Sequence, residues 1–339
     1  MPLIAIHGWL HPFWGNPGLA DKLDFLQGQG RAYDRVFFGS SRIFRHVSPH
    51  VLDSALADGG RSFNSGFAAT YTPEAELACA HFLRTAEHVP DFVFVELNMF
   101  KLYSDSNIAS CRDWYMMGPG VWMDHMAYIL GTSGSVGHKW KLAKWASLAC
   151  FKSMALPGFV DQWSNRKVQS DRALVFGERN DGFVPLEFEE EKAVAGMAER
   201  RRLLWSDTTI LHKRMLENLA VYDHPERAAP HSAQLRIMRD LAALGRSKGT
   251  KVVFILPPFT KAPELLAVFN QLPENARIDL CDPRKYPELY TTRYAFDKGH
   301  LNSAGSYLLS VALARELKRI GSGQRVDNGS GPLDHNAGL

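Results

Sequence analysis

Short, nearly uninterrupted apolar runs recur along the chain and predict the buried strands of a parallel sheet. They cover residues 36–38, 92–97 and 251–256, and turn residues or helical segments flank them. Strands that helices cover on both faces show this continuous apolar pattern, whereas half-exposed strands alternate between apolar and polar positions. Residues 62–67 predict a further strand and its exit loop, and the sheet is expected to begin at Arg35.

Segments with helical periodicity lie between and after these runs. Apolar positions recur with helical spacing over residues 73–86 and again over residues 301–317. Residues 20–27 predict a short helix, and residues 186–222 predict several, with Asp207 as a cap. Alternating strands and helices predict an α/β fold whose parallel strands are joined by right-handed crossovers. Ligands of such sheets bind beyond the carboxyl ends of the strands.

One α/β domain is predicted over residues 31–320, with a large helical insertion at about residues 101–248. The inserted stretch has many Trp, Met and His residues, carries little strand signal and is too long for a loop. Residues 1–30, rich in Trp, His, Pro and Gly, predict an irregular lead-in. Residues 321–339, rich in Gly, Ser, Asp and Asn, predict a disordered tail.

Composition and charge narrow the class of protein. With 339 residues, of which 45% are hydrophobic, the chain can bury a substantial core. Lys and Arg outnumber Asp and Glu by only 39 to 36, so the charge balance gives no support for nucleic-acid binding. The compact basic run at residues 199–202 lies among helix formers and is expected to be a solvated helix face. No run approaches the roughly 18 apolar residues that cross a bilayer, and the first residues lack the charged flank of a secretion signal.

The cysteines and histidines show no metal-site pattern, and no metal is expected. No Cys-x-x-Cys pair occurs, and the histidines considered as ligands lack a recognisable ligand spacing. Both two disulfides and four buried free thiols are compatible with the sequence. The cysteines are Cys79, Cys111, Cys150 and Cys281, and the histidines considered are His125, His138 and His212.

Two segments more than 250 residues apart carry candidate catalytic groups. The first apolar run ends abruptly in Gly39-Ser40-Ser41, and Asp297 and His300 stand three residues apart near the end of the chain. A serine hydroxyl is a weak nucleophile until an imidazole takes its proton, and a carboxylate must hold that imidazole in one tautomer. On a turn that leads into a helix, Asp297 and His300 present their side chains to the same side. Together the segments supply a nucleophile, a base and an orienting carboxylate.

The chain resembles the SGNH/GDSL hydrolase superfamily in four blocks that occur in the family's order. Residues 39–42 (Gly-Ser-Ser-Arg) resemble the first block, whose last serine is the nucleophile, so the resemblance gives this role to Ser41. Asp297 and His300 match the Asp-x-x-His of the fifth block. Arg42 is interpreted either as a solvated or ion-paired residue or as a ligand for an anionic group of the substrate.

The second and third blocks of the family supply oxyanion donors. Residues 64–66 (Asn-Ser-Gly) resemble the second block, whose glycine, here Gly66, offers its backbone N–H, as the nucleophile Ser41 also does. Asn98 resembles the asparagine of the third block, which donates its side-chain amide. The third block usually reads Gly-x-Asn-Asp, whereas residues 96–99 are Glu-Leu-Asn-Met. The alternatives are that Gly66 serves only a tight turn and that Asn98 only caps the following segment.

The resemblance implies a three-layer α/β/α fold with a flavodoxin-like parallel sheet, and a serine esterase that needs no cofactor. It implies an acyl-enzyme at Ser41 and, as substrate, an ester such as an O-acetyl group of a glycan in the cell envelope. An O-acyltransferase using the same three groups and a non-catalytic glycan-binding module are the alternatives. By resemblance the protein is expected to be periplasmic or extracellular, or tethered to a membrane in a longer precursor. The sequence leaves its oligomeric state open.

Overall fold

The computed structural model describes residues 11–28, 33–155, 160, 171–260 and 263–322. The first ten residues of the predicted lead-in lie outside this part of the chain. The predicted tail also lies outside it, apart from its first two residues, which end a helix. Within the lead-in, helix α2 (Pro17–Gly28) begins three residues before the helix expected at 20–27.

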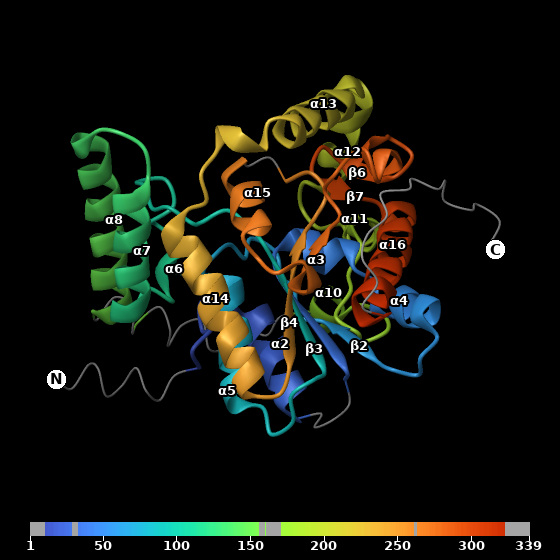
Figure 1. Cartoon of the computed structure of the whole chain (residues 1–339), viewed down its shortest axis with the longest axis horizontal. Helices are drawn as coiled ribbons and strands as arrows, with labels where there is room; N and C mark the ends of the chain where they lie inside the picture. Colours follow the sequence, from blue (N-terminus) through green and yellow to red (C-terminus); the bar gives the residue numbers. More distant parts are fainter. Residues whose placement is uncertain (1–10, 29–32, 156–159, 161–170, 261–262, 323–339) are drawn as a thin grey trace.

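Five parallel strands form the central sheet, and the sequence pattern predicts four of them (Figure 1). Their spatial order is β2-β1-β3-β4-β5, so the first strand along the sequence lies between the second and the third. In the register of the sheet, Val36 pairs with Phe63 on one side and with Val93 on the other. The strands are β1 (Arg35–Phe38), β2 (Ser62–Asn64), β3 (Phe92–Glu96), β4 (Lys251–Leu256) and β5 (Arg277–Asp279). β1 and β4 have the expected bounds at Arg35 and at 251–256, and β5 is a strand that the pattern did not predict.

Helices cover both faces of the sheet, and alternate strand residues divide between two hydrophobic clusters. On one face, Val36 and Val93 pack with side chains of α2, α5 (Glu74–Thr85) and α14 (Ser232–Ser247). On the other face, buried residues at the neighbouring strand positions pack with α4 (Pro49–Leu56) and α16 (Ser303–Ser322). Burial on both faces explains why the strands read as continuous apolar runs. The molecule is a mixed α/β protein, and its layers are compatible with an α/β/α arrangement.

In the described parts of the segment between β3 and β4, helices are joined by irregular stretches. Helices α7 and α8 lie side by side at one end of the molecule, and α13 lies at its upper edge in Figure 1. Helix α14 ends the segment and packs on the sheet beside β4 and α5, so the last part of residues 101–248 belongs to a helical layer of the sheet. The helices before α14 are α6 (Cys111–Trp114), α7 (Pro119–Gly131), α8 (Val136–Met154), α10 (Arg172–Phe176), α11 (Leu186–Glu191), α12 (Met197–Ser206), α13 (Thr209–Asp223) and the short 3-10 helix η1 (Pro225–Arg227).

The segment after β4 differs from the expectation at the Asp297 and His300 positions. These residues lie on a two-stranded antiparallel hairpin and not on a turn that leads directly into a helix. Helix α16 begins only at Ser303, because the chain first returns along β6 through a short strand. The elements of this segment are α15 (Pro263–Asn270), the 3-10 helices η2 (Glu274–Ala276) and η3 (Pro287–Tyr290), and the strands β6 (Ala295–Asp297) and β7 (His300–Leu301).

The structure bears on the state of the cysteines and on membrane-spanning helices. All four cysteines are free, which excludes the two disulfides, but only Cys79 and Cys281 are buried as expected, whereas Cys111 and Cys150 are partly exposed. Among the residues that the structure describes, no helix has the length and apolar character needed to cross a membrane. The proposed domain boundaries stay predictions.

Candidate active site

The turn after β1 fixes the position of Ser41. A Cβ on Gly39 would lie 2.7 Å from both Cβ and Oε2 of Glu96, so only glycine fits where the strand meets the following helix. Ser40 caps helix α3 (Ser41–His46), because its side chain accepts a hydrogen bond from the backbone N–H two residues later. Ser41 is consequently the first residue of α3, and its backbone N–H has no acceptor within the helix.

Glu96, the last residue of β3, is a fully buried carboxylate beneath this turn. Its Oε2 accepts the backbone N–H of Ser40 at 2.5 Å, and its Oε1 accepts the Ser40 hydroxyl at 3.0 Å. Oε1 also lies 3.1 Å from Nε of Arg42. A buried charge needs a paired charge and hydrogen bonds to be stable. Here those partners are the residues on either side of Ser41, so Glu96 anchors the turn that presents the Ser41 hydroxyl.

His300 lies between Ser41 and Asp297, within hydrogen-bond distance of both. Nε2 of His300 is 2.9 Å from Oγ of Ser41, and Nδ1 is 3.0 Å from both carboxylate oxygens of Asp297. Burial alone would raise the pKa of Asp297, but the hydrogen bond and charge of His300 and the backbone N–H of Gly299 hold that pKa below its ordinary value. Asp297 is therefore an ionised acceptor that holds Nδ1–H and leaves Nε2 facing the serine. The structure brings the three residues predicted for this role together.

Hydrogen bonds between distant segments hold the β6–β7 hairpin against α3. The backbone N–H of Leu301 donates to Nε2 of the buried His46 at 3.0 Å. Burial, helped by the positive charges around it, lowers the pKa of His46, which keeps Nε2 available as a neutral acceptor. The Ser306 hydroxyl of α16 donates to the carbonyl of Arg45 at 2.8 Å. These contacts explain how two side chains 259 residues apart meet.

A cavity of about 330 Å³ opens at Ser41 and His300. Its walls come from the segments that follow β1, β2, β3 and β4, from the hairpin turn and from helix α13, so it lies beyond the carboxyl ends of the strands. Among the described residues that line it, two carry guanidinium groups and none is an Asp or a Glu. The lining residues that matter below are Ser41, Arg42, Asn98, Arg214, Thr260 and His300.

Asn98, the residue expected to donate its amide to the oxyanion, lies in the wall of this cavity. Its Oδ1 accepts hydrogen bonds from Nη2 of Arg42 at 2.9 Å and from the backbone N–H of Met99 at 2.8 Å, and these two donors define the orientation of the amide. Its Nδ2 donates to the carbonyl of Thr70 at 3.2 Å. Because an amide nitrogen carries two N–H bonds, one remains for a ligand.

Gly66, the other expected donor, is not among the residues that line the cavity. Its backbone N–H donates to Oδ1 of Asn64 at 2.9 Å, and its carbonyl accepts from Nζ of the buried Lys22 at 2.8 Å. Lys22 also donates to the carbonyls of Asn64 and Gly182, which uses all three of its protons. A Cβ on Gly66 would lie 2.8 Å from the backbone nitrogen of Phe44. Close packing against the backbone of Phe44 explains why this position holds a glycine, whereas the oxyanion role and the alternative of a tight turn both stay predictions.

Each nitrogen of the Arg42 guanidinium has a partner within the protein. Its Nε pairs with Glu96 at 3.1 Å, its Nη1 donates to Oγ1 of Thr260 at 2.7 Å, and its Nη2 donates to Asn98. All three nitrogens therefore have protein partners although the residue lines the cavity. Of the two interpretations of Arg42, the geometry favours the ion-paired residue over the ligand for a substrate anion.

Three residues of this site were not found by reasoning from the sequence: Glu96, His46 and Arg214. Glu96 had a signal, since a charged residue at the end of an otherwise apolar buried strand must be compensated inside the fold. His46 and Arg214 had none. His46 is on the same short helix as Ser41, but its role depends on the β6–β7 hairpin packing against that helix. Arg214 reaches the site on α13, which is distant in sequence from the other site residues.

Within the described ranges, no group of three or more His, Cys, Asp or Glu side chains has an arrangement that could hold a metal ion. Comparison with known proteins adds no identification. No family model matches the chain, and no curated protein matches it in sequence. The likeness to the SGNH/GDSL superfamily therefore stays a resemblance carried by the four sequence blocks.

Proposed function

We propose that this protein is a serine-dependent esterase of the SGNH type that removes O-acyl groups, such as O-acetyl groups of a glycan, through an acyl-Ser41 intermediate. The observation that carries the proposal is the hydrogen-bonded series Ser41–His300–Asp297, with contacts of 2.9 and 3.0 Å, at the edge of a cavity. A hydroxyl in contact with an imidazole that a carboxylate orients is the arrangement that nucleophilic acyl transfer needs.

In the proposed reaction, Oγ of Ser41 attacks the ester carbonyl while its proton moves to Nε2 of His300. Asp297 stabilises the imidazolium that forms, and His300 then gives the proton to the departing alkoxide. We propose that the backbone N–H of Ser41 and the second N–H of Asn98 Nδ2 donate to the oxyanion. Water attacks the acyl-enzyme with His300 as base, and release of the carboxylic acid restores Ser41.

The same proposal extends to the fold. We propose that the five-stranded sheet is the flavodoxin-like sheet of the SGNH fold and that the helices before α14 form an insertion beside its carboxyl edge. In support, the candidate nucleophile follows β1, the candidate oxyanion amide follows β3, and the Asp-x-x-His pair immediately precedes the last described helix. The inserted helix α13 contributes a residue to the cavity wall.

A fluorophosphonate probe tests the nucleophile, because it forms a stable bond only with an activated serine. We expect one adduct by intact mass, located by peptide mapping to Ser41 and not to Ser40, and its absence in Ser41→Ala. Failure of the wild type to react with the probe and with a panel of aryl and sugar acetates refutes the proposal.

Turnover tests the oxyanion donor and the acceptor. Asn98→Ala is expected to lower kcat for p-nitrophenyl acetate about a hundredfold, because one oxyanion donor contributes about 3 kcal/mol. Acetate release without added oligosaccharide identifies a hydrolase, whereas release that depends on an oligosaccharide, with transfer to it, identifies an acyltransferase. Glycan binding that Ser41→Ala leaves intact, in a wild type without turnover, identifies a binding module.

A further inference from the structure

The cavity is lined by a guanidinium to which the described residues give no ion pair. Arg214 of α13 lines the cavity, and its Nε is buried without a hydrogen-bond partner. Within the described part of the chain, its guanidinium forms no ion pair or hydrogen bond, in contrast to Arg42 in the same wall. Asp297 and Glu217 exert some attraction on it, yet neither lines the cavity, and Asp297 is bound to His300.

A half-buried, unpaired guanidinium beside a nucleophile attracts an anionic group. Arginine presents several N–H donors in a planar fork that matches the two oxygens of a carboxylate. The attraction is strengthened because no carboxylate is among the lining residues and because Glu96 already balances the charge of Arg42. A neutral ester would leave Arg214 without a partner when it displaces water from the cavity.

We propose that Arg214 makes the site selective for esters that carry a carboxylate near the scissile bond. This inference rests on the proposed esterase function and assigns its substrate class. Arg214 is then a specificity-determining residue on the helical segment, while the sheet supplies the chemistry. The residue proposed to bind the anion is therefore not the one considered from the sequence, where Arg42 was the candidate ligand for an anion.

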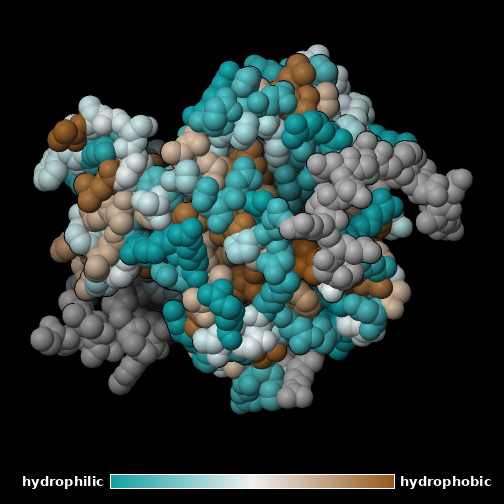
Figure 2. Space-filling model, viewed as in Figure 1, coloured by the Kyte–Doolittle hydropathy of each residue, from teal (hydrophilic) through white to brown (hydrophobic). Residues whose placement is uncertain are grey.

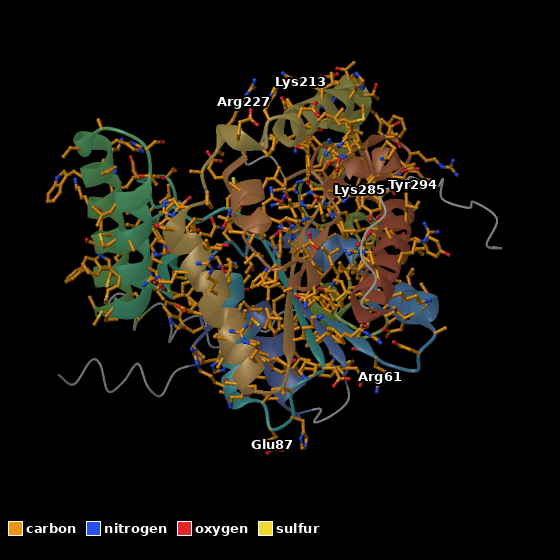
Figure 3. All side chains as sticks on the ribbon, in the orientation of Figure 1. Arg61, Glu87, Lys213, Arg227, Lys285 and Tyr294 are labelled. Carbon is orange, nitrogen blue, oxygen red and sulfur yellow. The ribbon has the colours of Figure 1, made fainter. Side chains whose placement is uncertain are left out.

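Matched ester pairs test this assignment. One pair is the acetyl ester of 4-hydroxybenzoate and that of 4-hydroxybenzamide, and a second places the charge in the acyl group, as the aryl monoester of glutarate and its amide. In each pair, the ratio of kcat/KM for the charged over the neutral ester is measured in wild type, Arg214→Met and Lys213→Met. Lys213 is the adjacent cation of α13 and lies exposed at the outer edge of the molecule (Figure 3).

We expect a ratio above one for at least one pair in the wild type, a fall of about tenfold or more in Arg214→Met, and no change in Lys213→Met. Added salt should lower the wild-type ratio, because screening weakens the attraction. Equal ratios in wild type and Arg214→Met for both pairs, with neutral esters still turned over, refute the role of Arg214 but not the esterase. Absence of turnover and of serine labelling refutes both.

A different observation concerns the surface of the α7–α8 hairpin. Large apolar side chains are exposed on it, and Figure 2 shows brown residues along its outer edge at the left. Three of them share one face of α8, since intervals of 4 and 11 residues are close to whole helical turns. The exposed residues and their exposed fractions are Met123 (65%), Leu130 (72%), Val136 (85%), Trp140 (74%) and Phe151 (66%).

The charged residues of α8 are all basic. Helix α8 contains four lysines and no Asp or Glu. Two of these lysines donate to backbone carbonyls, whereas Lys141 and Lys144 are exposed beside the apolar face. The acidic residue of α7, Asp124, is paired with Arg236 at 2.6 Å. Apolar and aromatic side chains flanked by lysines are the pattern of a helix that lies in a membrane interface.

We infer that the outer face of α8 binds an anionic lipid surface. Trp140 and Phe151 would enter the interfacial layer, and Lys141 and Lys144 would contact the headgroups, each lysine contributing roughly a fivefold gain in binding. This surface is separate from the cavity, so the inference does not depend on the proposed enzyme function.

Vesicle sedimentation tests the lipid surface with the full chain. We expect binding to phosphatidylglycerol vesicles, little binding to phosphatidylcholine, and a loss of about tenfold or more in Lys141→Glu/Lys144→Glu and in Trp140→Ala/Phe151→Ala. Trp205→Ala is the matched control, because Trp205 is 61% exposed on α12, away from the hairpin. Equal binding to both lipids, no binding to either, or a dimer that dissociates in Trp140→Ala refutes the inference.

Discussion

Replacing Glu96 by glutamine tests whether one buried carboxylate holds the turn that carries Ser41. The carboxylate accepts two hydrogen bonds from Ser40 and pairs with Arg42. Glutamine has the same shape, but only one of its two terminal atoms accepts a hydrogen bond. Either the backbone N–H of Ser40 or Nε of Arg42 then faces another N–H, and the charge of Arg42 loses its partner.

The expected cost follows from the burial of the pair. The side chain of Glu96 is 0% exposed and that of Arg42 is 15% exposed, so solvent screens their interaction only weakly. Removing one partner of a buried ion pair typically costs about 3–5 kcal/mol, which is a large share of the roughly 5–15 kcal/mol that stabilises a typical protein. The same change displaces Ser41, so acyl transfer is expected to fall together with stability.

Urea unfolding followed by circular dichroism measures the loss, with the slope of the transition checked for equality between variants. Arg42→Gln/Glu96→Gln should be destabilised by less than the sum of the single changes, because the second substitution removes a charge already left unpaired. Glu199→Gln, in an exposed pair with Arg202, is the control and should unfold as the wild type does. If Glu96→Gln unfolds at the wild-type urea concentration, the anchoring role of Glu96 is wrong.

Three further predictions address the site and the core. Asp297→Asn should lower kcat by a factor on the order of 10³–10⁴ with the fold retained, because an amide does not hold His300 in the required tautomer; an unchanged kcat contradicts this. Burial raises the pKa of Glu76 from 4.5 to about 7, so the folded state binds the extra proton and wild-type stability should fall by up to about 3 kcal/mol as pH rises through this interval. Glu76→Gln should show a flatter dependence in urea unfolding at successive pH values, and an identical dependence refutes the assignment. Gly39→Ala should lower Tm and activity together, because its Cβ has no room, whereas Gly118→Ala, with open space at the Cβ position, should melt as the wild type; equal melting of the two contradicts the steric argument.

Most strands of the sheet and the candidate nucleophile could be predicted from the sequence, because both depend on the local pattern of residues. Strands buried on both faces require continuous apolar residues, and the glycine before the two serines meets a steric demand that the pattern reveals. Asp297 and His300 were identified by their spacing, although the element that carries them is a hairpin and not a helix entry.

Features that depend on packing between distant segments could not be predicted from the sequence. Gly66 has the right neighbours in sequence, but its N–H bonds to Asn64 inside the fold. Arg214 enters the cavity only because α13 folds over the carboxyl edge of the sheet. The short strand β5 has three residues, and only its central residue is buried, which is too little pattern to recognise.

The strand order also has a consequence for how the protein is made. Strands β1, β2 and β3 have all been synthesised once the chain reaches residue 96. Strand β4, which pairs with the central strand β3, begins only at residue 251. During synthesis of the helices in between, the nascent chain therefore has an apolar strand edge without its partner, which is a site for wrong association. We expect the sheet to fold only after β4 has been synthesised. Chains whose synthesis ends before β4 are expected to require chaperones to stay unaggregated.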